Sequence, residues 1–293
     1  LHGQGFTLTH SGGGVVLAAD VSNVEIQNVV FAPTSTGRNI QINGNLGIGC
    51  SFHHNTLALG ADGGRSIGDA AGAVRSLNGA KIWANTVSLS YKGSGAVATI
   101  GYCSNFRAFG NTIITDAGDS GAIRNSFIGE CSNSENFGNR WVLTSGYQAT
   151  FDSGYRVNNN LVHDNALSFF AGLDVRSLIH DGGTNHQYLW NTFTMSTTPS
   201  GNYRAIRVRA ALSSSTSRVI IGYNLFDLRS TAGNYVCEFG DNENGSGTTN
   251  VAESYVYHNT VSNVAGAEKP FKLYGGTGCD DLYSWNNIYC GQQ

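Results

Sequence analysis

Proline, methionine and charged residues are scarce in this 293-residue chain, which contains 3 Pro, 1 Met and 13% charged side chains. No stretch has the pattern of a long helix, and no apolar run approaches the roughly 18 residues of a membrane span. Glycine is abundant, with 39 residues, and so is asparagine, with about thirty; both favour turns and extended segments. With 40% hydrophobic residues, the composition predicts a globular all-β chain and excludes a helical or membrane-spanning one.

An excess of positive charge is also missing, because the formal net charge is −3. Such a chain has no general attraction to phosphate backbones, so we expect no nucleic-acid partner. The absence of a C-x-x-C pair or a Cys/His cluster indicates no metal site and no cofactor, and calcium is not indicated either. The chain begins at Leu1 without an initiating Met or a signal sequence, so we expect a single domain over residues 1–293 that lacks its N-terminal start. Asn244 opens the one N-x-S/T sequon and is a candidate glycosylation site.

The clearest pattern is a repeat, in which Cys103–Asn111 returns almost unchanged as Cys131–Asn139. A related phrase of alternating apolar residues, an Asn and another apolar residue two places on recurs about every 30 residues along the chain. Because Asn tolerates left-handed backbone angles and stacked amides can form a hydrogen-bonded ladder, the phrase indicates stacked coils that turn at the Asn. The Asn markers are Asn28, Asn55, Asn85, Asn111, Asn139, Asn160, Asn191, Asn224, Asn259 and Asn286.

Apolar residues three places before and two places after the markers share one side of their strands, because side chains alternate along a strand. These positions are the predicted core: Phe52, Ile82, Val157, Tyr188, Ile221, Val256, Leu57, Val87, Ile113, Val162, Phe193, Phe226 and Val261. Cys50 and Cys237 are expected to be small buried residues, with their pairing left open.

From about Val24 to Ile288, these apolar-x-apolar-x-x-Asn-Thr-apolar phrases resemble the right-handed parallel β-helix proteins of the pectate-lyase-like superfamily. The resemblance implies a solenoid of about ten coils, each with three strands, and an Asn ladder at the corner between the second and third strands. It also implies association with a polysaccharide in an extracellular setting. The Gly-His-Gly, Asn-x-Asp and Arg-x-Lys signatures of polygalacturonases and the Asp cluster of calcium-dependent pectate lyases are missing, so no catalytic residue is assigned.

Stacked coils also bear on the six cysteines, an even number that suits disulfides and a secreted protein. Cys103 and Cys131 have the same phase in adjacent coils, so their Cα atoms should lie about 4.8 Å apart, within the range of disulfides. We predict a Cys103–Cys131 bond and a Cys279–Cys290 bond that closes the final coil. Stacked but reduced thiols are the alternative.

The first strand of each coil should begin about ten to fifteen residues before its marker. Candidates are Asn39–Ile42, Ala96–Ile100, Leu173–Arg176, Ala205–Arg209, Val236–Phe239 and Pro270–Leu273. If their apolar residues face inward, alternation turns a charged stripe outward. We predict this stripe as a binding surface for an acidic glycan, with solvated cross-strand ion pairs as the simpler alternative. The stripe consists of Asp174, Arg176, Arg207, Arg209, Glu238 and Lys272.

Aromatic residues next to the markers, namely His54, Trp190, Tyr223, His258 and Trp285, should project outward at the corner. Exposed rings there would stack against sugars, or would be covered by a loop or a neighbouring subunit.

We therefore expect an extracellular β-helix that binds an acidic polysaccharide or cleaves it as a lyase. The alternative is a noncatalytic β-helix that acts as an adhesin, a phage tail or fibre component, or a self-associating filament subunit.

Overall fold

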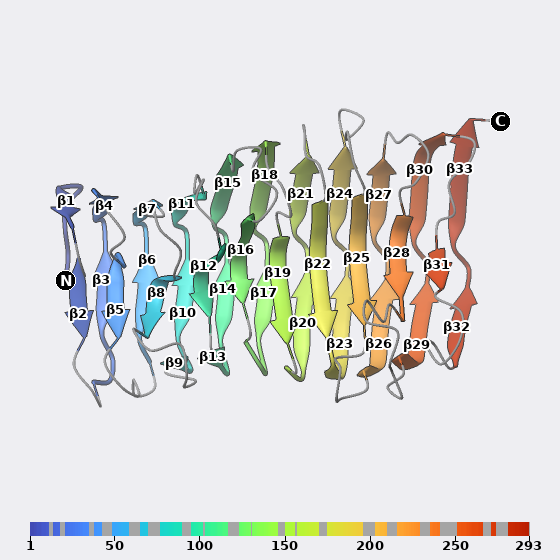
Figure 1. The fold of residues 1–293 in the computed structure, drawn as a ribbon, viewed down its shortest axis with the longest axis horizontal. Helices are drawn as coiled ribbons and strands as arrows, with labels where there is room; N and C mark the ends of the chain where they lie inside the picture. The colour runs from blue at the N-terminus through green and yellow to red at the C-terminus, as the bar shows by residue number, and fades with distance from the viewer. Residues whose placement is uncertain are drawn as a thin grey trace.

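The computed structural model describes residues 1–11, 14–17, 21–34, 38–42, 49–58, 65–69, 77–89, 95–101, 103–116, 123–129, 131–145, 150–155, 157–169, 175–195, 203–209, 216–228, 235–240, 251–265, 271–273 and 281–292. Its strands form three long parallel sheets of ten, eleven and ten strands, which we call sheets A, B and C. The chain passes through C, A and B in turn, and each circuit stacks on the one before it along the long axis of the molecule (Figure 1). The predicted parallel β-helix is therefore confirmed.

Sheet C holds the first strand of each coil: β2 (Val15–Leu17), β5 (Ile40–Ile42), β8 (Arg65–Asp69), β12 (Gly95–Gly101), β16 (Ile123–Gly129), β19 (Thr150–Tyr155), β22 (Val175–Asp181), β25 (Tyr203–Arg209), β28 (Tyr235–Phe239) and β31 (Phe271–Leu273). The predicted first strands all overlap strands of this sheet.

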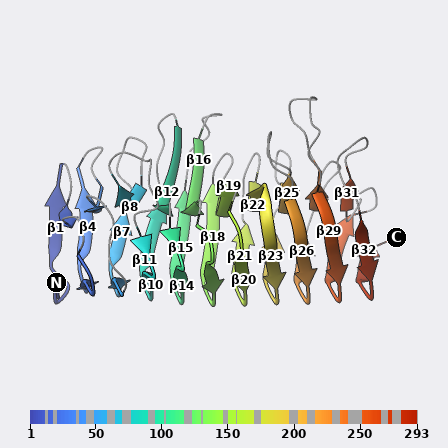
Figure 2. The same ribbon diagram turned by 90° about the horizontal axis from the view of Figure 1, so that it is seen from below.

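Sheet A follows with β3 (Glu25–Gln27), β6 (Ser51–His53), β10 (Lys81–Trp83), β14 (Arg107–Phe109), β17 (Glu135–Phe137), β20 (Asn160–His163), β23 (Gly183–Leu189), β26 (Thr216–Gly222), β29 (Val251–Tyr257) and β32 (Leu282–Trp285). Sheet B consists of β1 (Thr7–His10), β4 (Val30–Pro33), β7 (Thr56–Ala58), β11 (Thr86–Leu89), β15 (Thr112–Asp116), β18 (Arg140–Ser145), β21 (Ala166–Phe169), β24 (Thr192–Met195), β27 (Leu225–Leu228), β30 (Thr260–Ala265) and β33 (Ile288–Gln292). A short pair, β9 (Leu77–Asn78) with β13 (Cys103–Ser104), precedes sheet A (Figure 1). The view from below shows the same succession of coils, from β1 at one end to β32 at the other (Figure 2).

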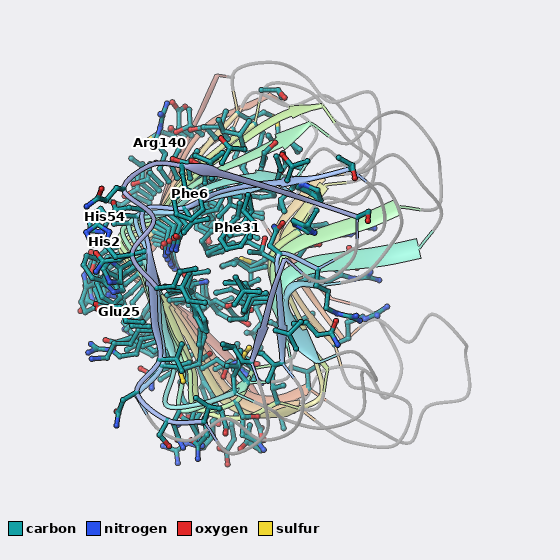
Figure 3. The ribbon with its side chains drawn as sticks, turned by 90° about the vertical axis from the view of Figure 1, so that its left-hand side faces the viewer. His2, Phe6, Glu25, Phe31, His54 and Arg140 are labelled. Atoms are coloured by element: carbon teal, nitrogen blue, oxygen red, sulfur yellow. The ribbon has the colours of Figure 1, made fainter. Side chains whose placement is uncertain are left out.

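None of the described residues lies in a helix, and no helix that could cross a membrane is present among them. The core runs along the inside of the three sheets, where one side chain in two points inward. All the predicted core positions are buried, and so are Cys50 and Cys237. The view along the axis shows Phe31 inside the ring of strands, with Glu25 and His54 outside it (Figure 3).

A ladder of asparagines runs along the turn between sheets A and B, which we call the A/B corner. In each rung, the Asn Oδ1 accepts the backbone N–H of the preceding ladder residue at 2.9 to 3.1 Å. Most side-chain amides also donate to the next Oδ1, as from Asn111 to Asn139 at 2.8 Å. The ladder consists of Asn55, Asn85, Asn111, Asn139, Asn165, Asn191, Asn224, Asn259 and Asn287.

Three predicted markers are not ladder residues. Asn160 lies in β20 and faces the core, and Asn165 holds the ladder position instead. Asn165 lies 26 residues from both Asn139 and Asn191, so the ladder spacing is regular here, whereas a marker at Asn160 would make the two intervals unequal. At the two ends, the ladder positions belong to Val29 and Asn287 in place of Asn28 and Asn286.

The predicted disulfides are wrong, because Cys103, Cys131 and Cys290 are not bonded to another cysteine. Adjacent Ser104 and Ser132 pair in parallel, so the two preceding thiols do stack. Side chains in register on parallel strands point the same way, and their Cβ atoms keep the strand spacing of about 4.8 Å instead of the roughly 3.8 Å typical of disulfides. Cys279, the expected partner of Cys290, lies outside the described residues, as does the sequon residue Asn244.

Candidate functional site

Every coil turns from sheet A into sheet B through one residue with left-handed backbone angles, which stands directly before the ladder position. The φ of this residue lies between 52° and 63° in every coil. Glycine adopts this conformation without strain. For other residues it costs about 1 to 2 kcal/mol, although Asn and Asp tolerate it best. These corner residues are Asn28, His54, Ala84, Gly110, Gly138, Asp164, Trp190, Tyr223, His258 and Asn286.

Three bulky rings occupy this strained position in consecutive coils: Trp190, Tyr223 and His258. The rings of Trp190 and Tyr223 stack with centroids 5.6 Å apart, and those of Tyr223 and His258 stack at 5.1 Å. Trp190 is 51% exposed and Tyr223 46%. We call these three residues the corner ridge, and the predicted outward position of its rings is confirmed.

One face of Trp190 has no ring stacked on it among the described residues, and we call this face the open face. Tyr223 stacks on the face that looks toward the later coils, and no ring in the described part of the chain stacks on the other face. That face looks toward the preceding coil, where Asp164 holds the same corner position between the paired residues His163↔Leu189 and Ala166↔Thr192. The open face of the half-exposed Trp190 ring therefore lies next to an exposed carboxylate.

A line of charged groups leads up to the ridge across three coils. Arg107 Nε donates to Glu135 Oε2 at 2.6 Å, and Glu135 Oε1 lies 3.3 Å from His163 Nε2. His163 Nδ1 lies 2.7 Å from Asp164 Oδ2. The imidazole thus connects the two carboxylates, and it fixes the side chain of Asp164 although that side chain is 60% exposed.

A second set of rings lies on the outer face of sheet A, one residue before the corner. His53 stacks on Trp83 at 4.1 Å, Trp83 on Phe109 at 5.8 Å, Phe109 on Phe137 at 5.1 Å and Phe137 on His163 at 5.1 Å. The inner members of this stack have both faces covered by the neighbouring rings. They stabilise the coils and present only their edges to a ligand.

The charged stripe predicted on sheet C is partly buried. Arg207 is 1% exposed and Glu238 0%, and Arg207 Nε lies 2.8 Å from Glu238 Oε1. Arg204, which the sequence reasoning did not single out, donates from Nε to the other oxygen of Glu238. A cross-strand ion pair is therefore present at Arg207, but it is buried, whereas the alternative considered from the sequence was a solvated pair. The expectation that Arg207 and Glu238 are exposed is wrong.

The other stripe residues are less closely defined. Arg209 is partly exposed and pairs in register with Asp181, while Asp174 lies outside the described residues. Arg176 and Lys272 lie in β22 and β31 of the same sheet, and Lys272 pairs in register with Glu238. A glycan-binding role for the stripe stays a prediction.

Asp152 and His186 are buried in the core. Burial raises the pKa of Asp152 to about 7, and a 3.3 Å hydrogen bond from Asn136 Nδ2 partly offsets this. Asn136 Oδ1 also accepts from the ladder residue Asn139 at 2.7 Å. Burial lowers the pKa of His186 to about 4. The alternation of side chains along their strands could have predicted that Asp152 and His186 point inward. It could not have predicted the surroundings that shift their pKa values.

The described residues contain no cluster of three or more His, Cys, Asp or Glu side chains placed to hold a metal ion.

Comparison with known proteins agrees with this architecture. No family model matches the chain, and no curated protein matches it by sequence. Among solved structures, it is similar to a point mutant of the tailspike protein of E. coli bacteriophage HK620 in complex with a pentasaccharide, with a TM-score of 0.55 and 14% identity. The match covers 97% of this chain and 59% of the tailspike chain, and at this identity it shows the β-helix fold alone.

Proposed function

We propose that this protein binds a polysaccharide through the corner ridge of Trp190, Tyr223 and His258. One observation carries the proposal: three bulky, exposed rings occupy a backbone conformation that favours glycine. Strain of this kind persists where function requires it, because substitution by Gly or Asn would otherwise relieve it.

Stability alone does not account for the ridge. Left-handed angles cost about 1 to 2 kcal/mol for a residue such as Trp190, whereas ring stacking returns about 0.5 to 1.5 kcal/mol. Since about half of the Trp190 side chain stays in contact with water, burial adds little to that return. The same corner is built at Gly110 and Gly138 without any side chain.

The surroundings of the ridge suit a sugar better than a protein partner. At its later end the ridge meets further rings on sheet A, because Tyr257 contacts Tyr223 and stacks on Trp285 at 4.9 Å. At its open end it lies beside the hydrogen-bonding groups of His163 and Asp164. Sugar rings combine a face that stacks on aromatic residues with hydroxyl groups that bond to such side chains. The oligosaccharide complex of the similarly folded tailspike supports this choice.

A polysaccharide ligand also supports an extracellular site of action, in a tailspike-like or adhesin-like role. Cleavage is not part of the proposal. Binding to a second copy of the chain is the competing use of exposed rings, and it would appear as self-association that Trp190→Gly abolishes.

The test is affinity electrophoresis against a panel of polysaccharides, followed by calorimetry on those that retard the protein. Trp190→Gly should weaken binding about tenfold or more, because an aromatic contact of about 1.4 kcal/mol corresponds to a factor of ten. Ala84→Gly changes the same backbone position away from the ridge and should bind like the wild type. Equal binding by the wild type and Trp190→Gly would contradict the proposal.

A further inference from the structure

We infer that the sugar unit stacked on the open face of Trp190 carries no negative charge, and that Asp164 is the residue that selects for this. The inference rests on the proposed function of the ridge and names the class of its ligand. It differs from the acidic polysaccharide expected from the stripe on sheet C.

Asp164 lies next to Trp190 in the stack of coils. It holds the same corner position one coil earlier, and its backbone N–H donates at 3.2 Å to the carbonyl of Leu189, the residue before Trp190. Coils are stacked at the strand spacing of about 4.8 Å, so a sugar ring on the open face of Trp190 lies against Asp164. The carboxylate is exposed to such a ligand.

The hydrogen bonds of the carboxylate give the second step. His163 Nδ1 occupies Oδ2 of Asp164 at 2.7 Å, and the opposite nitrogen of His163 faces Glu135. The described contacts of Asp164 leave Oδ1 to accept hydrogen bonds from a ligand. Sugar hydroxyls donate to a carboxylate in charge-assisted bonds, whereas an anionic sugar offers a second negative charge to it.

The other charges nearby do not reverse this balance. Arg107, the cation in the line leading to the ridge, is bound to Glu135. Arg140 is exposed at the start of β18, beside Ala166 on the sheet B side of the corner, and Asp227 lies on β27 beyond it. Of these groups, only Asp164 occupies the corner position in the coil next to Trp190. Its charge therefore has the largest influence on a ligand at the open face.

The matched variant is Asp164→Asn. Asparagine has nearly the same shape and already occupies this corner position at Asn28 and Asn286, with φ of 58° and 52°. The backbone should therefore accept the change without added strain. The variant removes the negative charge and keeps a side-chain oxygen that accepts hydrogen bonds.

The experiment measures binding at low salt to neutral polymers (laminarin, dextran and mannan) and to anionic ones (polygalacturonate and alginate). The wild type should bind at least one neutral polymer about tenfold or more tightly than either anionic polymer. Asp164→Asn should weaken neutral binding several-fold and strengthen anionic binding, so that the preference narrows. Added salt should raise anionic binding by the wild type only, because it screens the repulsion.

Tighter binding of an anionic polymer by the wild type, unchanged in Asp164→Asn, would overturn the inference. The proposed function would stand in that case if Trp190→Gly still lost binding. Failure of every polymer to bind, or binding unaffected by Trp190→Gly, would remove the proposed function and this inference with it.

Discussion

The A/B corner has two halves with the same backbone and different side chains. After His54, the chain turns through the small residues Ala84, Gly110 and Gly138 in three successive coils. In three later coils it turns through Trp190, Tyr223 and His258. Asparagines of one ladder lie beneath both halves, with the same hydrogen bonds. The ladder therefore holds the backbone conformation of the corner, and the side chain at the corner position can differ from coil to coil.

The core beneath the two halves also differs. Asp152 lies near the first half and is linked through Asn136 to the ladder at Asn139, while His186 lies in the coil of Trp190. The pKa of the first is raised and that of the second is lowered. The two halves should therefore respond to pH in opposite directions.

Removal of one ladder residue should have the largest effect. In Asn111→Ala, the backbone N–H of Asn85 and the carbonyl of Ile82 lose their partners in a buried site. At about 1 to 3 kcal/mol for each unsatisfied group, we expect a loss of about 4 kcal/mol in the free energy of unfolding, measured by urea denaturation.

The control is Asn133→Gly, which removes an exposed asparagine with left-handed angles. Its amide donates to Asn105 at 3.3 Å, and its Oδ1 accepts from Asn159 at 2.8 Å. Water replaces both bonds at this exposed site, so the change should be below about 1 kcal/mol. Equal losses in the two variants would mean that the ladder is not what defines the corner.

Asp152 should produce the next largest effect, and one that depends on pH. Its pKa is higher in the folded chain than the ordinary 3.8, so the folded state binds more protons between about pH 4 and 7. Stability from this group is therefore lost as pH rises through that window. Asp152→Asn should remove this slope and be the more stable protein at pH 8.

His186 gives the opposite sign, because its pKa is lower in the folded chain than the ordinary 6.5. The unfolded state binds more protons between about pH 4 and 6.5, so stability falls as pH drops through that range. Urea titrations of His186→Gln should show a flatter acid limb than the wild type. An unchanged acid limb would show that His186 binds the same number of protons in the folded and unfolded states, and would contradict the lowered pKa.

Placing a side chain in the first half should have the smallest effect. A Cβ on Gly138 would have no heavy atom nearer than 4.0 Å, so only backbone strain opposes it. Gly138→Ala should lower the free energy of unfolding by about 1 to 2 kcal/mol, and Gly138→Asn by less, because Asn tolerates left-handed angles. Equal stability of the wild type, Gly138→Ala and Gly138→Asn would show that left-handed angles cost no free energy at this corner, and would contradict the strain argument for the ridge.

Much of this architecture could be predicted from local sequence. The repeated Asn and the alternating apolar residues indicated the coils, the ladder and the buried faces, because each depends on backbone geometry within one coil. The run Asn158-Asn159-Asn160 obscured the true marker Asn165, since residue type alone does not distinguish a corner from a strand. The outward corner rings were also predicted.

The errors came from properties that involve more than one coil. Bonding of Cys103 to Cys131 depends on the direction of the two Cβ atoms as well as on the Cα spacing. Burial of Arg207 and Glu238 depends on what covers the outer face of sheet C, which alternation does not reveal. The strained left-handed conformation of Trp190 could be recognised only from its backbone angles, which the sequence does not give. Membership of the pectate-lyase-like superfamily stays a prediction.

The most direct test of the central claim compares stability and glycan binding in the same variant, Trp190→Gly, with Ala84→Gly as its control. Both changes relieve left-handed strain, so the free energy of unfolding of each variant should equal or exceed that of the wild type. Trp190→Gly alone should lose polysaccharide binding. A large loss of stability in Trp190→Gly with binding intact would show that the ridge serves the fold, and would contradict the account.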